Sequence, residues 1–268
     1  MQLEGRSVLL TGATGGIGEA IARELATRGC ALTLTGRRQA ELARLVTDLG
    51  PPAHGFAADL TNLAEIRELL DHAGPVDILV ACAGIDTPQD LADTSDQAIE
   101  EAIRINLLAP AALSRAALPS MKQRGAGHIV FIGSVAGRVA TPINSSVYAA
   151  TKWGLRGLGL ALRQELHGTG VGVSTVSPAG VRDAGMFART GLTLPWYAGT
   201  SSPEDVARAV VRAIERDRPE VVVAAGGERL GAALSGVAPV LVGRIARVAG
   251  LGRIRQAVRD AQRRGEGS

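Results

Sequence analysis

Short apolar runs alternate along this chain with segments of helical periodicity. Seven runs have the length and composition of β-strands: Ser7–Thr11, Ala31–Thr35, His54–Ala58, Ile78–Ala81, His128–Ser134, Val171–Val176 and Glu220–Ala225. The intervening segments carry apolar residues three and four positions apart and end at glycines, as in Ile17–Arg28, Ala40–Leu49 and Leu63–Ala73. Strands that alternate with helices form right-handed crossovers and therefore a parallel sheet. The pattern predicts an α/β protein with a doubly wound parallel sheet of about seven strands.

Charge separates the chain into two parts. We expect one α/β domain over residues 1–225 and a helical C-terminal extension over residues 226–268, because 268 residues fit one wide sheet covered on both faces. The extension holds eight arginines and three acidic residues, a net charge of +5, whereas the remainder carries a net charge of −2. The body therefore lacks the basic surface typical of a nucleic-acid-binding protein.

The C-terminal extension has the pattern of a basic amphipathic helix interrupted near Pro239. Its apolar stripe consists of Leu234, Val237, Leu241, Ile245 and Val248. The uncharged stretch 230–243 is too short to cross a bilayer. Three kinds of surface could cover this apolar stripe. The first is an anionic membrane and the second an acidic carrier protein. The third is the body of the protein or a second subunit, with the arginines left in solvent.

The N-terminus and the cysteines favour a cytoplasmic protein. Met1–Gly5 leads directly into the first strand without the basic and apolar regions of an export signal. Cys30 and Cys82 lie beside or within apolar runs, where a reduced thiol packs as a small hydrophobic group. The sequence predicts no metal site.

A glycine-rich segment, Thr11–Gly18, joins the first strand to the first helix. Glycines let the backbone approach a pyrophosphate, and the helix N-terminus offers unpaired N–H groups to it. A simple tight turn would also use glycines, but the position after the first strand of a βαβ unit favours dinucleotide binding. The predicted contacts are Gly12, Thr14, Gly15, Gly16, Ile17 and Gly18.

Two arginines after the second strand bear on the choice of dinucleotide. Arg37 and Arg38 could bind the 2′-phosphate of NADPH, whereas a carboxylate at this position would favour NADH. Two solvated arginines at a strand end are the alternative. Asp59, after the third strand, could accept a hydrogen bond from the adenine amino group or cap the next helix. We predict NADPH/NADP+ as the cofactor, with NADH/NAD+ as the alternative.

Tyr148 and Lys152 stand four residues apart at the start of a predicted helix. This spacing places both side chains on one face, with Cβ atoms about 5–6 Å apart. A neighbouring ammonium lowers the pKa of a phenol from its ordinary value of about 10 and fits it for proton transfer. The chain has 27 arginines but only Lys122 and Lys152 as lysines. A lysine here therefore favours a specific role over a surface charge beside a packed tyrosine.

Two further polar residues stand at positions suited to chemistry. Ser134 closes the fifth predicted strand at its carboxyl end, where its hydroxyl could donate to a substrate carbonyl oxygen. Asn106 lies in a helix-like segment, where asparagine is mildly unfavourable, and could hold a water or a bent backbone carbonyl. Taken singly, each residue is better explained as structural.

The whole set resembles the short-chain dehydrogenase/reductase family over roughly residues 3–225. The resemblance is carried by the glycine motif, Asp59, Ala83-Gly84, Asn106, Ser134 and Tyr148-xxx-Lys152. It implies that Tyr148 is the general acid/base and that Ser134 polarises the substrate oxygen. It further implies that Lys152 orients the nicotinamide ribose and lowers the pKa of Tyr148, and that Asn106 holds a proton-relay water.

The same resemblance extends the set of cofactor contacts and indicates an oligomer. The implied contacts include Leu60, Ala83, Gly84, Asn106, Tyr148, Lys152, Pro178, Gly180 and Val181, the last through its backbone N–H. A homodimer or homotetramer would form through the helices near Asn106 and Tyr148. Three features depart from the family pattern. Cys82 stands where an asparagine is usual, Ala179 separates Pro178 from Gly180, and a threonine often found downstream is replaced in the run Val181-Arg182-Asp183.

The segment Asp183–Ser202 has turn residues and no clear periodicity, and we interpret it as a substrate lid. Its candidate substrate contacts are Met186, Phe187, Trp196 and Tyr197, with Ser134 and Tyr148 beneath them. These aromatic residues favour an apolar carbonyl or secondary alcohol, so we expect an NAD(P)-dependent oxidoreductase. The alternatives are a catalytically idle nucleotide-binding scaffold or sensor and, with little room for its substrate domain, a sugar-nucleotide epimerase or dehydratase.

Overall fold

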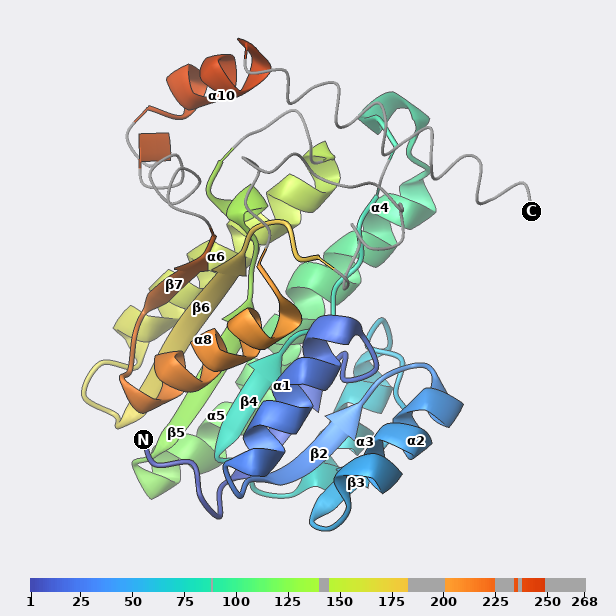
Figure 1. Ribbon diagram of the computed structural model, residues 1–268, viewed down its shortest axis with the longest axis vertical. Coiled ribbons are helices and arrows are strands. Elements are labelled where there is room, and N and C mark those ends of the chain that lie inside the picture. The colour runs from blue at the N-terminus through green and yellow to red at the C-terminus, as the bar shows by residue number, and fades with distance from the viewer. Residues whose placement is uncertain (88, 140–144, 183–200, 225–233, 236–237, 249–268) are drawn as a thin grey trace.

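The computed structural model describes residues 1–87, 89–139, 145–182, 201–224, 234–235 and 238–248. Seven parallel strands form one sheet in the order β3-β2-β1-β4-β5-β6-β7 (Figure 1). The strands are β1 (Ser7–Thr11), β2 (Ala31–Thr35), β3 (Ala53–Gly55), β4 (Ile78–Ala81), β5 (Gly127–Ile132), β6 (Val171–Pro178) and β7 (Glu220–Val223). The order reverses between β1 and β4, which is where doubly wound sheets bind ligands. The predicted fold class is confirmed.

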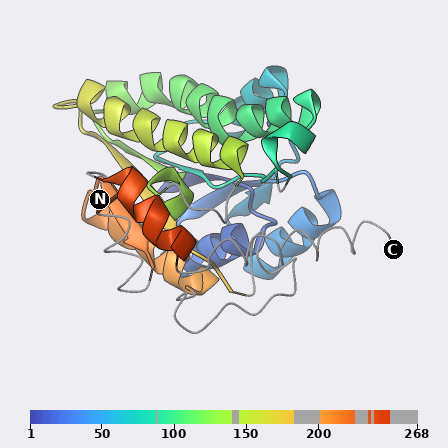
Figure 2. The ribbon, with the colours of Figure 1, turned by 90° about the horizontal axis from the view of Figure 1, so that it is seen from above.

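Helices cover both faces of the sheet, as the view from above shows (Figure 2). One face is covered by α1 (Gly16–Thr27), α2 (Gln39–Leu49) and α8 (Pro203–Glu215). The other is covered by α3 (Leu63–Ala73), α5 (Ala109–Arg124) and α6 (Ser146–Glu165). Shorter elements are α4 (Asp96–Ile103), η1 (Leu91–Asp93), the π-helical turn η2 (Arg104–Leu108), η3 (Val135–Gly137) and α10 (Pro239–Val248).

Alternation along β1 divides the interior into two hydrophobic cores. Val8 and Leu10 pack with residues of α1 and α8, whereas Leu9 packs with residues of α3, α5 and α6. Successive side chains of a strand point to opposite faces, so a strand buried on both sides is continuously apolar. This explains why the predicted strands contain so few polar residues.

Most predicted strand boundaries agree with the structure, and the differences arise at strand ends. β3 ends at Gly55 instead of Ala58, because this edge strand pairs with β2 only from Leu32↔Ala53 to Leu34↔Gly55. β5 ends at Ile132, two residues before the predicted end, which leaves Gly133 and Ser134 in the following turn. β6 runs on to Pro178 because it pairs with β7 up to Pro178↔Val223. Residue 225, the predicted end of the last strand, lies outside the described residues.

The strands all end at the same edge of the sheet, and α10 lies beyond that edge (Figure 1). Pro239 begins α10, in agreement with the predicted break, and proline suits this position because a helix's first residue needs no N–H partner. Val237, part of the predicted apolar stripe, lies outside the described residues. Among the helices of the described ranges, none combines the length and apolarity that a membrane span requires.

Candidate active site

The carboxyl ends of the central strands and the first turns of α6 bring the predicted catalytic residues together. Ser134 directly precedes η3, and its Oγ accepts a hydrogen bond of 3.1 Å from the N–H of Ala136. Ser145 caps α6, with its Oγ accepting from the N–H of Tyr148 at 3.1 Å. Local turn chemistry therefore fixes the backbone on both sides of the site.

Tyr148 and Lys152 occupy consecutive turns of α6 and are almost wholly buried, with 6% and 4% of their surfaces exposed. The side chain of Ser134 lies close enough to the phenol of Tyr148 to lower its pKa. The Nζ of Lys152 lies 5.6 Å from the centroid of the Tyr148 ring and donates to the carbonyl of Ile132 at 3.0 Å. The structure thus places a hydroxyl, a phenol and an ammonium side by side at the end of β5.

Burial dominates the electrostatic balance at Tyr148. Burial raises the pKa of Tyr148 above its ordinary value; the side chain of Ser134 opposes this increase, and the charge of Asp86 adds to it. Burial lowers the pKa of Lys152 to about 8, although Cys82 and Asp86 raise it. Burial is the largest of these influences on Tyr148 and Lys152 is not among them, so the lowering of the Tyr148 pKa by Lys152 stays a prediction. At neutral pH the phenol carries its proton.

Asn106 anchors the loop that follows β4. Its side chain is fully buried in the π-helical turn η2, between α4 and α5. Its Oδ1 accepts from the N–H of Ile85 at 2.8 Å, and its Nδ2 donates to the carbonyl of Ile85 at 2.8 Å and to Thr151 Oγ1 at 3.0 Å. Asn106 therefore joins the loop after β4 to helix α6.

Four residues that the sequence analysis missed complete this network. The Oγ of Ser145 lies 2.8 Å from Thr87 Oγ1 and donates to Asp86 Oδ1 at 3.3 Å. The Oγ1 of Thr151 donates to the carbonyl of Tyr148 at 2.8 Å. Ser145 could have been found as a helix cap three residues before Tyr148. Nothing in the local sequence marks Asp86, because its position depends on how the loop folds.

The glycine motif forms a cradle in which side chains would not fit. Gly12 has a φ of +68°, and a Cβ there would lie 2.7 Å from the Cα of Ala83. A Cβ on Gly18 would lie 2.1 Å from the carbonyl oxygen of Gly12. Gly15 caps α1 without any side-chain hydrogen bond, so no side chain blocks the N–H groups at the start of α1. This arrangement fits the pyrophosphate of a dinucleotide.

The segment after β4 connects the cradle to the catalytic residues. The Oγ1 of Thr11 accepts from the N–H groups of Cys82 and Ala83, at 3.1 and 3.2 Å. A Cβ on Gly84 would lie 3.3 Å from both Asn106 Oδ1 and Lys152 Nζ. Burial raises the pKa of the Cys82 thiol to about 12. Backbone hydrogen bonds to Thr11 therefore support this segment, in which Cys82 replaces the usual asparagine.

Comparison with known proteins agrees with this geometry. A family model described as short chain dehydrogenase matches residues 6–193. The chain belongs to the short-chain dehydrogenase family. It is 41% identical over 228 residues to the ketoacyl reductase HetN of Nostoc sp. (strain PCC 7120), covering 82% of this chain and 79% of that protein.

Two solved structures of similar dehydrogenases contain a dinucleotide. A short-chain dehydrogenase from Sphingobium yanoikuyae in complex with NADPH is 31% identical, with a TM-score of 0.74, covering 86% of this chain and 93% of that one. A short-chain dehydrogenase/reductase from Burkholderia phymatum in complex with NAD is 27% identical, with a TM-score of 0.74, covering 83% and 90%. Both forms of the cofactor therefore occur among similar chains.

The two arginines of this short-chain dehydrogenase that were predicted to bind a 2′-phosphate are exposed and have acidic partners. Arg37 forms an ion pair of 3.2 Å with Glu101 of α4. Arg38 precedes α2, forms an ion pair of 2.6 Å with Glu41 and donates to the carbonyl of Thr14 in the glycine motif. Of the two, Arg38 is thus the one that contacts the cradle.

Asp59 and Leu60 lie between β3 and α3. The Oδ1 of Asp59 accepts from the N–H of Thr61 at 2.9 Å. The alternative role of Asp59 as the helix cap is wrong, because Asn62 caps α3 by accepting from the N–H of Ala64 at 2.9 Å. Leu60 is buried.

The segment after β6 is held by pairing with the residues that precede α8. Val181 is buried and forms a parallel bridge with Ser201, flanked by hydrogen bonds of 3.0 Å from Ser201 to Gly180 and from Arg182 to Ser201. Ser202 caps α8, so the predicted lid extends too far at its carboxyl end. Met186, Phe187, Trp196 and Tyr197 lie outside the described residues.

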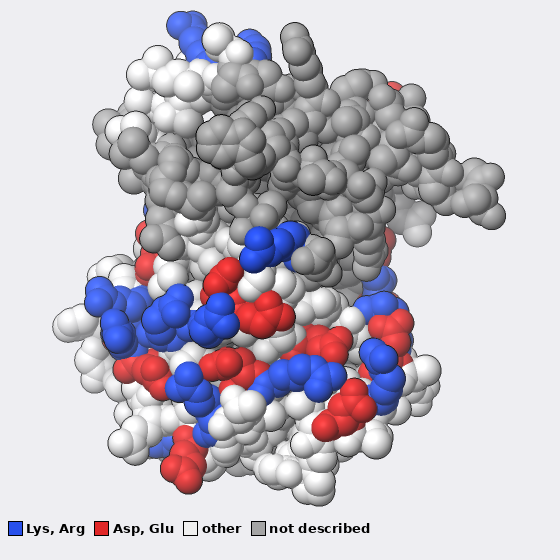
Figure 3. Space-filling model, viewed as in Figure 1, with Lys and Arg blue, Asp and Glu red and all other residues white. Residues whose placement is uncertain are grey.

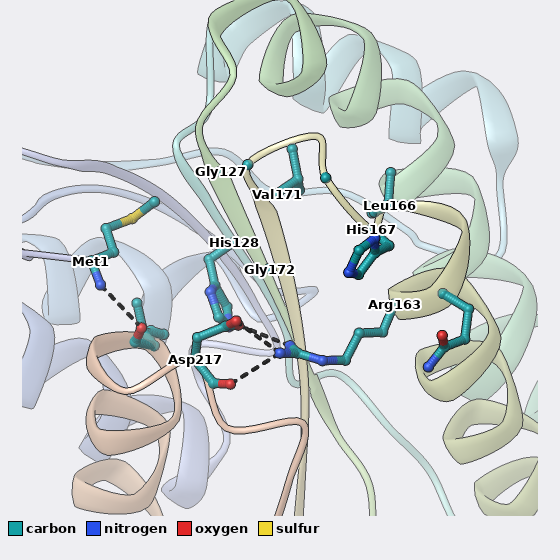
Figure 4. Close-up of a pocket in the computed structure, with 13 residues that line it drawn as sticks. Met1, Gly127, His128, Arg163, Leu166, His167, Val171, Gly172 and Asp217 are labelled. Atoms are coloured by element: carbon teal, nitrogen blue, oxygen red, sulfur yellow. Dashed lines mark hydrogen bonds and ion pairs between the residues drawn. The ribbon is translucent and has the colours of Figure 1, made fainter.

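A surface pocket at the opposite edge of the sheet contains none of the predicted site residues (Figure 4). It is lined by the amino ends of β5 and β6, with His128, Arg163, His167 and Asp217 as its charged or titratable side chains beside the N-terminus. Arg163 and Asp217 form an ion pair of 2.7 Å. His128 Nε2 lies 2.8 Å from Ser174 Oγ, and burial lowers the pKa of His128 to about 4. We interpret this cluster as structural support for the strand ends.

Proposed function

We propose that this short-chain dehydrogenase is an NADPH-dependent reductase of an apolar carbonyl compound, with β-ketoacyl thioesters as the first substrate class to test. The observation that carries the proposal is the grouping of Ser134, Tyr148 and Lys152 at the carboxyl end of β5. Substrates bind at this edge in doubly wound sheets. The similarity to a protein named ketoacyl reductase supports the substrate class.

Proton transfer follows from the state of Tyr148. Its phenol is protonated at neutral pH, because burial raises its pKa, and it donates that proton to the substrate oxygen as the carbonyl becomes an alcohol. The Ser134 hydroxyl donates a second hydrogen bond to the same oxygen. The ammonium of Lys152 stabilises the phenolate left behind, from a distance of 5.6 Å to the ring centroid. A nicotinamide dinucleotide, when bound, supplies hydride to the carbonyl carbon.

The residues present fit that dinucleotide. The cradle of Gly12, Gly15 and Gly18 would hold the pyrophosphate against the start of α1. Lys152 would reach the nicotinamide ribose, since a Cβ on Gly84 in the cofactor-binding segment would lie 3.3 Å from its Nζ. Arg38, in contact with the cradle, is the better placed of the two arginines to bind a 2′-phosphate, and this supports NADPH over NADH.

The surroundings of Tyr148 also bear on the substrate. The carboxylate of Asp86 raises the pKa values of both Tyr148 and Lys152, so it lies close enough to repel a negative charge. We infer that the substrate carries no carboxylate next to the reacting carbonyl. The aromatic residues predicted in the lid support an apolar chain instead. The cytoplasmic location and the homodimer or homotetramer expected from the sequence belong to the same proposal.

Cofactor binding and turnover test the proposal separately. Nicotinamide fluorescence would be titrated with NADPH and NADH, and reduction of acetoacetyl thioesters and apolar ketones would be followed by NADPH absorbance. We expect Arg38→Ala to weaken NADPH but not NADH, and Arg208→Ala on α8, an exposed arginine with the same i,i+3 pairing to an acidic residue, to change neither. Tyr148→Phe should abolish turnover and retain nucleotide binding.

The outcomes distinguish the alternatives. Failure of both nucleotides to bind would overturn the oxidoreductase function. Nucleotide binding without turnover of any carbonyl or alcohol would favour the catalytically idle scaffold. Equal affinity for both nucleotides, unchanged by Arg38→Ala, would contradict the NADPH preference alone.

A further inference from the structure

Helix α10 exposes large apolar side chains to solvent. The exposed fractions are 70% for Val240, 57% for Leu241, 59% for Ile245 and 90% for Val248. Leu234, in the short turn that precedes α10, is 52% exposed. An apolar surface of this kind on one short helix indicates an interaction partner, because soluble proteins rarely leave contiguous apolar patches uncovered.

The exposed face of α10 also carries positive charge. At 100° per residue, Leu241, Ile245 and Val248 fall within a sector of about 60°, and Arg244 and Arg247 both follow on the Val248 side, about 40° and 100° from Val248. Both arginines are exposed, and α10 contains no aspartate or glutamate. Figure 3 shows basic side chains projecting from the end of the molecule at which α10 lies. An apolar sector with a basic face beside it is typical of helices that lie in a membrane interface.

We propose that α10 binds the surface of an anionic membrane, with its apolar sector below the headgroups and its arginines against lipid phosphates. Charge complementarity supports this occupant, because the C-terminal extension holds eight arginines and three acidic residues. The acidic surface of a carrier protein would pair with the arginines but leave Leu241, Ile245 and Val248 in water. A bilayer interface accommodates both groups, since arginine extends its apolar stem along the helix and its head into the headgroup region.

The position of α10 gives the interaction an orientation. α10 lies beyond the carboxyl ends of the strands, on the side of the sheet that α8 covers (Figures 1 and 2). Binding through α10 therefore turns the edge of the sheet that holds Tyr148 toward the bilayer. Under the proposed function, an apolar substrate dissolved in the membrane would reach the site from this side. The membrane interaction itself does not depend on that function.

Vesicle co-sedimentation of the full chain tests the interaction. The probes are vesicles of phosphatidylcholine alone and of an equimolar mixture of phosphatidylcholine and phosphatidylglycerol. We expect binding to the mixed vesicles that weakens as salt increases, and little binding to phosphatidylcholine alone. Replacing Leu241 and Ile245 together by glutamate should abolish binding.

The arginines provide a graded test with a matched control. One arginine near an anionic surface contributes about five-fold in affinity, so the double change Arg244→Gln and Arg247→Gln should weaken binding roughly 25-fold. The control is Arg212→Gln with Arg216→Gln, which removes the same charge from exposed positions at the far end of α8. This control should bind like the parent chain.

Three results would overturn the proposal: no binding to mixed vesicles, equal binding to both kinds of vesicle, or binding that survives the glutamate pair. Light scattering on the variant with Leu241 and Ile245 replaced by glutamate tests whether a second copy of the chain covers α10 instead. In that case the parent chain would not bind vesicles, and the variant would dissociate from a larger oligomer. NADPH titration of the same samples separates the two proposals. Vesicle binding without nucleotide binding would overturn the proposed function and leave the membrane interaction in place.

Discussion

Replacement of Asn106 by leucine should destabilise the protein, because Asn106 joins the loop after β4 to helix α6. Leucine has a similar volume, but it removes three hydrogen bonds of 2.8, 2.8 and 3.0 Å. The N–H and carbonyl of Ile85 lose their partner, and the hydroxyl of Thr151 keeps only its bond to the Tyr148 carbonyl. An unsatisfied buried group costs about 1–3 kcal/mol, and the groups of Ile85 are only partly buried, so we expect a total of about 3 kcal/mol.

Urea denaturation measures this loss directly, and thermal unfolding should show a decrease in Tm of roughly 6–12 °C. Thr151→Val is the matched control, because it removes one partner of Asn106 and the bond to the Tyr148 carbonyl but leaves both bonds to Ile85. We expect about 1 kcal/mol for this control. Equal losses for the two variants would refute the reasoning, since Asn106 would then not hold the loop after β4.

The remaining predictions concern the cradle, the strand ends and the charge beside Tyr148. Gly18→Ala should weaken NADPH binding at least ten-fold in a fluorescence titration, because its Cβ would lie 2.1 Å from the carbonyl oxygen of Gly12. The pKa of His128 is lowered to about 4, so the unfolded chain takes up a proton at higher pH than the folded chain. The free energy of unfolding should therefore fall by about 2 kcal/mol between pH 8 and pH 5, and His128→Gln should remove this part of the decrease in urea titrations. Asp86→Asn should lower the pKa of Tyr148 and shift the pH profile of alcohol oxidation to lower pH, since oxidation needs the phenolate.

Each of these three predictions has its own control or contrary outcome. Gly157→Ala is the control for Gly18→Ala, because nothing lies within 4 Å of a Cβ on this helical glycine, and it should leave NADPH binding unchanged. An unfolding free energy with the same pH dependence in the parent and in His128→Gln would show that His128 titrates normally in the folded protein. A shift of the Asp86→Asn profile to higher pH would contradict the assigned direction.

Features that depend on neighbouring residues in the chain were predicted well. The boundaries of β1, β2, β4 and α3 agree with those predicted from the spacing of apolar residues. The strands bury both of their faces and the helix buries one, so the spacing of apolar residues along the chain indicates each element. The relation between Tyr148 and Lys152 was likewise available from their spacing. Helix geometry alone places residues four apart on one face.

Features that depend on distant residues required the folded chain. Arg37 pairs with Glu101, 64 positions away, and Ser145 contacts Asp86, 59 positions away. The spacing gives the direction in which Lys152 acts on Tyr148, but burial, which depends on every element around α6, decides the net pKa. The sequence by itself therefore determined the alternation of strands and helices, the glycine motif and the Tyr-Lys pair. The tertiary structure decided partners, protonation and exposure, because these depend on which surfaces meet and how far water is excluded between them.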